Sequence, residues 1–296
     1  MPVRFTGAKL AACLTAVSMF LSAMTQAAEH DVPRIAIVID DMGNALRPGR
    51  AALALPGEMT YAFLPHTPFA GHLAEQAKQL GKEVMLHLPM ESKKALPLGP
   101  GGLQLDMSRD AFRDTLDAGL ASVPHVVGVN NHMGSLLTSD LAAMRWLMKD
   151  LSRRGLYFVD SRTTLASVAE EQARKGAVSV TRRDVFLDSS REPGQIRHQF
   201  HRLLQLAGRR GSALAIGHPY PETLQVLAEE LPRLEALGVE LVPASRLTMI
   251  HLRKNLWHVS SSLSPKVAKN LKPSPSSTCC EGPASKWSPP DSATDR

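Results

Sequence analysis

Acidic and histidine side chains follow short apolar segments in this sequence. Asp40 and Asp41 come directly after the aliphatic run 35–39, and His87 lies near the end of the run 83–88. Carboxylates and imidazoles bind a catalytic Zn²⁺ or a similar divalent ion, which keeps three protein ligands and an open position for water. Such an ion lowers the pKa of its water towards ~7, and a carboxylate beside it can act as general base. The residues therefore predict metal-assisted hydrolysis.

Later apolar runs also end in residues that can bind a ligand. These residues are Asn131, His132, Asp160, Arg162 and His218. Each one alone has an ordinary explanation, because an Asp often caps a turn and a lone His is often a hydrogen-bonded core residue. In a parallel barrel, however, all carboxyl ends of the strands meet on one face. Their shared position at the ends of successive runs predicts one converging pocket.

The segments that must position these residues alternate between strand-like and helix-like patterns. Apolar runs predict strands at 35–39, 59–64, 83–88, 126–129, 156–159, 177–180, 212–216 and 239–242. Amphipathic stretches predict helices at 46–55, 69–80, 108–122, 139–154, 165–175, 192–210 and 221–237. Alternation of this kind indicates parallel βαβ units. Seven or eight units in about 215 residues favour an α/β barrel over an open sheet.

Capping residues set the expected ends of several helices. Ser108 is the expected N-cap of the helix at 108–122, and Ser139 or Thr138 that of the helix at 139–154. Their side-chain oxygens can accept a hydrogen bond from the first turn. Gly155 and Gly211 follow two helices, where a left-handed residue commonly ends the helix.

The chain has 296 residues, a hydrophobic content of 44% and a formal net charge of +6. The excess charge lies at the two ends of the sequence. Residues 29–250 contain equal numbers of basic and acidic residues, so the folded part is neutral. A groove that binds nucleic acid is therefore not expected.

Residues 1–28 have the pattern of a secretory signal peptide. Arg4 and Lys9 precede an apolar stretch at 10–23, and cleavage is expected near Ala27 or Ala28. The apolar stretch is short for a full membrane span, so no stable span is expected after cleavage. The sequence thus predicts a periplasmic or secreted bacterial protein.

Residues 251–296 are rich in Ser, Pro and Lys, and they predict a disordered basic tail after one domain at 29–250. The cysteines are Cys13 in the leader and Cys279 and Cys280 in the tail. The predicted domain therefore has neither a disulfide framework nor a thiolate metal site. Any metal ion there must be bound by His, Asp, Glu or Asn.

Five motifs carry a resemblance to a known family. They are Ile-Asp-Asp-Met-Gly at 39–43, Leu-His-Leu-Pro-Met-Glu at 86–91, Gly-Val-Asn-Asn-His-Met-Gly-Ser at 128–135, Phe-Val-Asp-Ser-Arg-Thr at 158–163 and Ile-Gly-His-Pro at 216–219. Over about residues 33–246 the chain resembles the divergent polysaccharide deacetylases, secreted bacterial proteins of the NodB-homology type. The resemblance implies an irregular (β/α)7 barrel. It also implies hydrolysis of N- or O-acetyl groups on an envelope glycan with a divalent metal ion, Zn²⁺ being the one expected.

The resemblance also assigns roles to individual residues. Asp40 falls on the general base and Asp41 on a metal ligand. His87 falls on the first histidine of the motif that supplies two ligands, and His218 on the general acid.

The usual motif has a second ligand histidine four positions after His87, and this sequence has Glu91 there. Either Glu91 or His132 can complete the metal site, and we favour Asp41, His87 and His132 as the ligands. The further candidates for ligands or supporting groups are Glu91, Asn131, Asp160 and Arg162. The substitution leaves an alternative function open, a catalytically inactive glycan-binding or scaffold protein. A metal-dependent phosphoesterase is a weaker alternative, because no Gly-rich phosphate loop accompanies the site.

Overall fold

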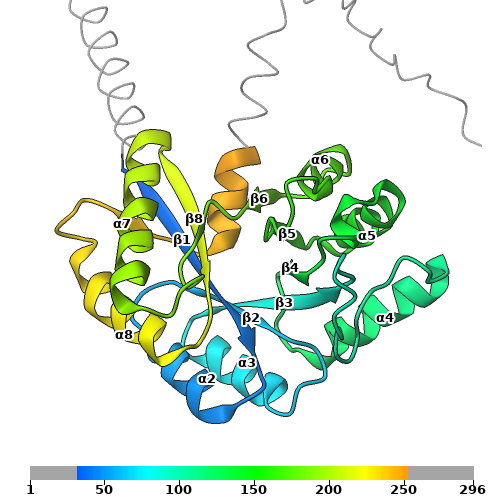
Figure 1. The fold of residues 1–296 in the computed structure, drawn as a ribbon, viewed down its shortest axis with the longest axis horizontal. Coiled ribbons are helices and arrows are strands. Elements are labelled where there is room, and N and C mark those ends of the chain that lie inside the picture. Colours follow the sequence, from blue (N-terminus) through cyan, green and yellow to red (C-terminus); the bar gives the residue numbers. More distant parts are fainter. Residues whose placement is uncertain (1–31, 253–296) are drawn as a thin grey trace, which may run out of the picture. The chain divides into compact units, whose positions relative to one another are not determined.

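The computed structural model describes residues 32–252 (Figure 1). The predicted signal peptide and nearly all of the predicted tail lie outside the described residues. Within them, nine parallel strands form one sheet: β1 (Arg34–Met42), β2 (Thr60–Phe63), β3 (Glu83–Met90), β4 (Gly128–Met133), β5 (Tyr157–Asp160), β6 (Val180–Arg182), β7 (Val185–Phe186), β8 (Ser212–Gly217) and β9 (Glu240–Leu241). Their order is β6-β5-β4-β3-β2-β1-β8-β7, and β9 pairs with β1.

The sheet curls into an irregular barrel. Strands β6 and β7 lie at opposite ends of the strand order, yet only Arg183 and Asp184 separate them in the sequence. Three peptide units span at most about 11 Å between Cα atoms, so the two edges of the sheet must approach each other. The predicted barrel of the NodB type is confirmed, with seven longer strands and the two-residue strands β7 and β9.

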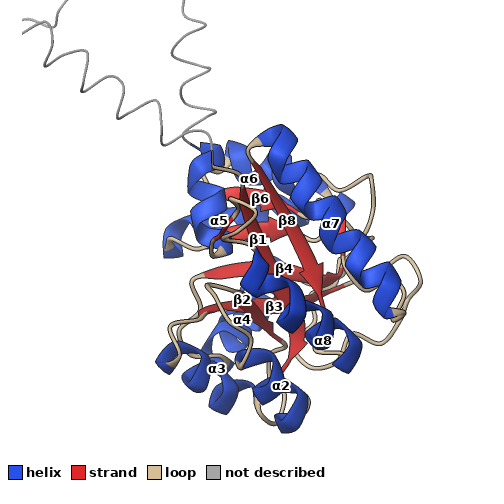
Figure 2. Cartoon of the chain, turned by 90° about the vertical axis from the view of Figure 1, so that its left-hand side faces the viewer, coloured by secondary structure: helices blue, strands red, loops and turns tan. Residues whose placement is uncertain are grey.

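Helices connect the strands and cover the outside of the sheet (Figures 1 and 2). They are α2 (Leu46–Leu53), α3 (Ala70–Gln79), α4 (Arg109–Ser122), α5 (Leu141–Arg154), α6 (Ala169–Lys175), α7 (Pro193–Arg210) and α8 (Pro221–Glu230). A large apolar core fills the space between the sheet and these helices. Among residues 32–252, no helix is long and apolar enough to cross a bilayer.

A second, smaller apolar cluster fills the inside of the barrel. On β1 it contains Ala36 and Val38, and on β8 it contains Leu214 and Ile216. Alternate residues of a strand point to the same face, so the next inward-facing residue of β1 is Asp40. On β8, where Leu214 and Ile216 point inward, the next residue on the same face is His218, just after the strand ends. The barrel interior is thus apolar in its middle and polar at the carboxyl ends of the strands.

Three of the predicted helix-capping residues are confirmed, and one predicted N-cap is wrong. Ser108 caps α4 by accepting a hydrogen bond from the Ala111 amide, and Gly155 and Gly211 end their helices with left-handed φ angles of 67° and 82°. Asp140, not Ser139 or Thr138, caps α5 by accepting from Ala143.

Two predicted helices are shorter than expected. The helix predicted from residue 165 begins at Ala169, and Leu165 is 92% exposed in the preceding loop. The helix predicted to reach residue 237 ends at Glu230 and continues only as a 3₁₀ turn, Leu231–Arg233. Pro232 has no backbone N–H to continue the α-helical hydrogen bonds, which explains this end.

Three strands extend further into the polar motifs than predicted. β1 ends at Met42, β3 at Met90 and β4 at Met133. Asp40, Asp41 and the polar residues of β4 therefore lie on strands and not in the loops after them, while His87 lies within its strand as predicted. This position makes them more rigid, since strands hold side chains more precisely than loops do.

Candidate metal centre

Asp40 and Asp41 both face the barrel mouth because β1 is irregular at this point. The pairing of β1 with β2 shifts register between Ile39 and Met42, and Asp41 has a φ of 57°. A bulge adds a residue to one strand and redirects a side chain, so two consecutive carboxylates can reach one pocket. The left-handed conformation costs a non-glycine residue of order 1 kcal/mol, and Asp tolerates it better than most residues.

Asp41, His87 and His132 bring three potential ligand atoms together. His132 Nδ1 lies 3.0 Å from His87 Nε2 and 3.1 Å from Asp41 Oδ1, and His87 Nε2 lies 3.3 Å from the same oxygen. Asp41 Oδ1 is buried and has no hydrogen-bond partner among the described residues. Such an unsatisfied buried carboxylate oxygen between two imidazoles requires an explanation, and a bound cation is one that chemistry supports.

The geometry of these atoms fits a small divalent ion. A tetrahedral Zn²⁺ with bonds of about 2.0–2.1 Å separates its ligands by roughly 3.3–3.4 Å, close to the observed distances. His87 Nδ1 lies 2.8 Å from Asn130 Oδ1, an acceptor, so this nitrogen carries the proton. In the neutral ring, the lone pair of His87 then lies on Nε2, which faces Asp41 and His132. Two imidazoles and one carboxylate form a ligand set for Zn²⁺ or a similar ion.

Asn130 connects the candidate ligands to the second carboxylate. Its side chain accepts from His87 and donates from Nδ2 to Asp40 Oδ1 over 2.8 Å. The register pairs His87 with Asn130 across β3 and β4, which puts both side chains on the inner face. Asn130 therefore fixes the tautomer of one candidate ligand and the orientation of Asp40 at the same time.

The pKa values of the two carboxylates move in opposite directions. For Asp40, burial is the largest influence and raises the pKa, although His87 and Asn130 lower it. Burial also opposes ionisation of Asp41, but the imidazoles of His132 and His87 hold its pKa well below the usual range. Asp41 is thus suited to stay charged as a ligand, and Asp40 to exchange a proton.

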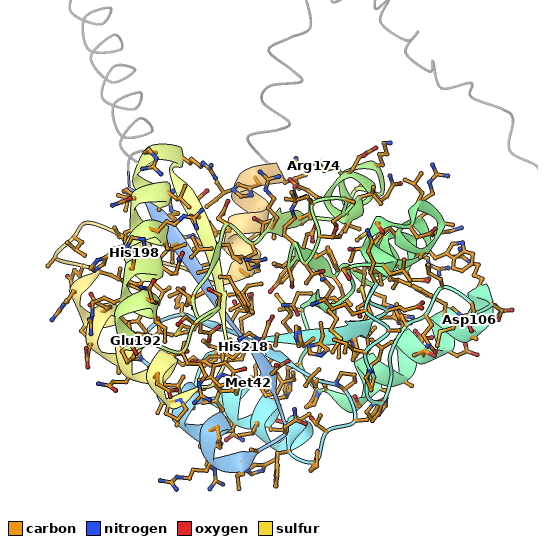
Figure 3. All side chains as sticks on the ribbon, viewed as in Figure 1. Met42, Asp106, Arg174, Glu192, His198 and His218 are labelled. Atoms are coloured by element: carbon orange, nitrogen blue, oxygen red, sulfur yellow. The ribbon has the colours of Figure 1, made fainter. Side chains whose placement is uncertain are left out.

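His218 lies on the other side of Asp41, with Nε2 3.7 Å from Asp41 Oδ2. Its Nδ1 lies 2.9 Å from Asp188 Oδ1, and its backbone N–H donates to Asp188 Oδ2. The imidazole stacks on Tyr220 at 5.3 Å and meets the ring of Phe186 edge-on at 5.5 Å. These contacts fix the ring and leave Nε2 directed at the site. Figure 3 shows His218 near Met42, where β8 lies beside β1.

The pKa of His218 is raised by its carboxylate partner. Burial is the largest influence and lowers the pKa, but the hydrogen bond and charge of Asp188 together with Asp40 and Asp41 outweigh it. His218 is therefore suited to keep a proton to higher pH than a free imidazole does and to donate it from Nε2.

The sequence from residue 37 to residue 248 matches the family described as divergent polysaccharide deacetylase. This match covers well over half of the chain. The chain belongs to the divergent polysaccharide deacetylase family.

Two bacterial proteins are similar in sequence to most of this chain. It is 40% identical over 235 residues to the uncharacterized protein YibQ of Escherichia coli K12, covering 79% of this chain and 72% of that one. It is 36% identical over 233 residues to an uncharacterized protein of Haemophilus influenzae, covering 79% and 80%. The crystal structure of the uncharacterized protein ATU2773 from Agrobacterium tumefaciens C58 has the same fold. Its TM-score is 0.70 at 24% identity, and the match covers 73% of this chain and 89% of that chain.

In this member of the divergent polysaccharide deacetylase family, the side chain of Glu91 does not belong to the cluster of ligand atoms. Its Oε2 accepts a hydrogen bond from the Leu105 amide over 2.8 Å. Its backbone carbonyl accepts from Leu136 and Leu137. Glu91 thus connects the long loop after β3 to the turn after β4, and His132 occupies the position beside Asp41 and His87. Of the two alternatives for completing the site, the geometry favours His132.

The remaining predicted residues lie at the strand ends without joining the cluster. Asn131 accepts from the Ser161 amide and donates to the Met133 carbonyl, so it faces away from the barrel interior. Asp160 accepts from the Arg162 amide and from the Ser167 hydroxyl. These contacts hold the loop after β5 beside the site, and their residues support the mouth of the barrel.

Two residues of the site were missed from the sequence. Asn130 could have been found by extending β4 to His132, since alternation then places residues 130 and 132 on one face. Asp188 lies two residues beyond the end of β7. The strand-end rule could have identified it only if β7 had been predicted. That strand contains only Val185 and Phe186, too short for any periodicity to predict it.

Proposed function

We propose that this protein is an exported, metal-dependent hydrolase that removes N- or O-acetyl groups from a glycan of the bacterial envelope. The observation that supports it most is the convergence of Asp41, His87 and His132, with Asp40 beside His87 and His218 beside Asp41. Membership of the divergent polysaccharide deacetylase family supports the substrate class. Export is supported by the leader pattern of residues 1–28.

Asp41, His87 and His132 would hold the ion. When bound, a divalent ion of this kind polarises an acyl carbonyl and makes water more acidic. Asp40 then acts as general base and takes the proton of the attacking water. Its raised pKa suits this step, because a base near the operating pH combines the correct protonation state with sufficient driving force. Asn130 keeps the Asp40 carboxylate in place during the transfer.

His218 acts as general acid for the leaving group. Asp188 accepts a hydrogen bond from Nδ1 and raises the pKa of the ring, which favours a proton on Nε2 that can pass to the departing amine or alkoxide. The base and the acid thus both lie beside the candidate ligands, Asp40 next to His87 and His218 next to Asp41. This is the arrangement that hydrolysis of an acyl group requires.

Acetate release from acetylated envelope glycan by zinc-loaded protein tests the proposal. Wild-type protein should release acetate, and a chelator should stop the release. Asp40→Asn should lower kcat by about 10²–10⁴-fold, the range typical of a lost general base. Asp106→Asn is the matched control, since Asp106 is exposed and lies far from His218 (Figure 3). Absence of acetate release from every acetylated glycan of the envelope would contradict the proposal.

A second candidate function is glycan binding without turnover. It is favoured by Glu91, which takes the place of the usual histidine and holds a backbone amide instead of joining the ligand atoms. Tight binding of the glycan with no acetate release would support this candidate. Turnover that His132→Ala abolishes would exclude it.

A further inference from the structure

A hollow of about 220 Å³ opens beside Asp41 and His218. One wall comes from the segment after β1 and the start of α2, with Met42, Asn44 and Pro48. The opposite wall comes from the segment after β8, with Pro219 and Tyr220. We call this hollow the β1–β8 pocket. It is continuous with the candidate metal centre, because Asp41 and His218 belong to both.

The general acid indicates which part of a substrate enters the β1–β8 pocket. A group that donates a proton must lie within hydrogen-bond reach of the atom it protonates. His218 forms part of the pocket wall, so the leaving atom lies at the entrance of the pocket. The group attached to that atom, which is the sugar and not the acyl methyl, then occupies the space behind it.

The lining of the pocket suits a sugar ring, which has both apolar C–H faces and polar hydroxyl groups. Pro48 and Pro219 offer apolar surface, while the Asn44 amide can bond a hydroxyl group. Binding sites of this type combine a mainly apolar lining with a few polar groups that orient the ligand. Because a cavity of about 150 Å³ holds a benzene molecule, 220 Å³ is enough for one substituted six-membered ring.

Tyr220 makes the pocket wall rigid. Its ring stacks on His218, and the Arg191 guanidinium lies over it at 4.8 Å from the ring centroid. Arg191 is itself held by hydrogen bonds to both oxygens of Glu222, at the start of α8. These contacts hold the Tyr220 ring in place as one wall of the pocket. The other wall is the start of α2, where buried Gly49 packs next to Leu73.

We propose that the β1–β8 pocket binds a single sugar ring, so the protein acts on a terminal or free acylated sugar and not on residues inside a long chain. This inference rests on the proposed function for the identity of the reacting sugar. Asn44 and Tyr220 are its specificity-determining residues.

Binding to the zinc-loaded Asp40→Asn protein tests the inference without turnover. The probes are N-acetylglucosamine and its β-1,4-linked tetramer, compared by calorimetry. A one-ring pocket predicts dissociation constants within about threefold of each other, whereas a cleft with several subsites predicts a tetramer that binds at least tenfold more tightly. The second result, or no binding of either sugar, overturns the inference.

Two substitutions, each combined with Asp40→Asn, test whether the sugar binds in the β1–β8 pocket. Ala45→Trp fills the space, because Ala45 lines it, and should weaken binding at least tenfold. Asn44→Ala should weaken it about two- to tenfold, the value of one hydrogen bond. Arg47→Ala, in the first turn of α2 and outside the pocket, is the control and should bind like the parent. Unchanged binding in both pocket variants overturns the inference.

Acetate release separates this inference from the proposed function. If wild-type protein deacetylates the tetramer at internal residues, the proposed function stands and the one-ring pocket is wrong. If no acetate is released while sugar binding depends on Asn44 and Ala45, the pocket stands and the hydrolase proposal is wrong.

Discussion

The two ends of the barrel interior use their polar side chains in different ways. At the amino end of the strands, Glu83 Oε1 accepts hydrogen bonds from Thr60, Tyr157 and the Ser245 amide. At the carboxyl end, Asp41 Oδ1 is buried without a hydrogen-bond partner among the described residues, and two imidazole nitrogens face it. Polar groups that satisfy one another stabilise a fold. Those that converge on a common point without doing so form a site for a ligand.

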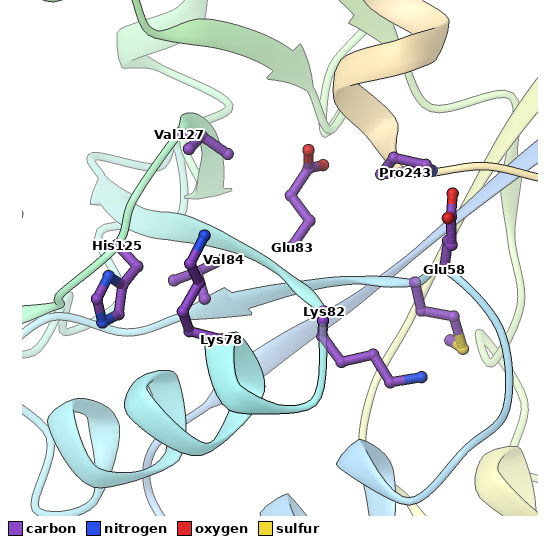
Figure 4. A pocket seen from close by; sticks show the side chains of 10 residues that line it. Glu58, Lys78, Lys82, Glu83, Val84, His125, Val127 and Pro243 are labelled. Atoms are coloured by element: carbon purple, nitrogen blue, oxygen red, sulfur yellow. The ribbon is translucent and has the colours of Figure 1, made fainter.

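The hollows at the two ends differ in the same way. The hollow near Glu83 measures about 270 Å³ and is lined by Lys78, Lys82 and His125 (Figure 4). Lys82 donates to the carbonyls of Leu55 and Gly57, and His125 is paired with Glu75. These contacts tie neighbouring segments together. The smaller β1–β8 pocket has the candidate catalytic residues in its wall, so the chemistry of the lining is more informative than the volume.

The largest expected effect is the loss of metal and turnover in His132→Ala. The substitution removes one of three candidate ligands, so zinc affinity should fall at least 100-fold and acetate release at least 1,000-fold. The free energy of unfolding of the metal-free protein should change by less than about 1 kcal/mol, since His132 is partly exposed. Zinc titration, steady-state kinetics and urea denaturation measure these quantities.

His125→Ala is the matched control at the other end of the barrel. It removes an exposed pair with Glu75 and should leave zinc affinity and turnover unchanged. Equal effects of the two substitutions would contradict the difference between the two ends.

Asp188→Asn should produce the next largest effect on turnover. Removing the carboxylate takes away the charge and the hydrogen bond that raise the pKa of His218. The acid form is then lost at lower pH, so the alkaline limb of the kcat/KM profile should move to lower pH. At pH 8 the rate should fall about 10- to 100-fold. An unshifted pH profile would show that His218 does not act through this pair.

Glu83→Ala should destabilise the fold without affecting the metal. It leaves the hydroxyls of Thr60 and Tyr157 and the amide of Ser245 without their acceptor, which should lower the free energy of unfolding by about 2–3 kcal/mol. Zinc stoichiometry at 10 °C should stay the same. Loss of zinc binding in folded Glu83→Ala protein would mean that the two ends are not independent.

The smallest expected effect is a pH dependence of stability in the metal-free protein. Burial alone would lower the pKa of His87, but Asp40 and Asp41 raise it to about 9, above the ordinary histidine value of about 6.5. A raised pKa contributes stability that is complete below about pH 6.5 and is lost as pH rises through about 9. The free energy of unfolding should therefore fall by roughly 1–3 kcal/mol over this interval.

Zinc-loaded protein should lack this decline, because the ion requires the unprotonated Nε2 of His87. His87→Gln should also lack it, while His125→Ala should keep it. Parallel pH curves for the zinc-loaded and metal-free proteins would contradict the assignment of His87 as a ligand.

Much of this architecture could be predicted from the sequence. Alternating strand and helix patterns indicated the barrel, and the strand-end rule brought Asp40, Asp41, His87, His132 and His218 to one face. The bulge at Asp41 could not be predicted, since it depends on the register between β1 and β2. Asp188 was missed because β7 is only two residues long. Both features depend on contacts between distant segments.

The metal-centre geometry was also only partly predictable. The sequence left Glu91 and His132 as alternatives, because four-residue spacing and strand position pointed to different residues. The hydrogen bond from Leu105 to Glu91 distinguishes them, and it depends on the path of a loop rich in Pro and Gly. Such a loop carries no periodic signal that fixes its path.

A crystal structure of zinc-soaked protein, with anomalous data on both sides of the zinc absorption edge, tests the central claim most directly. We expect one zinc peak bonded to Asp41 Oδ1, His87 Nε2 and His132 Nδ1 at about 2.0–2.2 Å, with Glu91 still bonded to the Leu105 amide. A zinc ion bound by Glu91 in place of His132, or no zinc at these three residues, would contradict the claim.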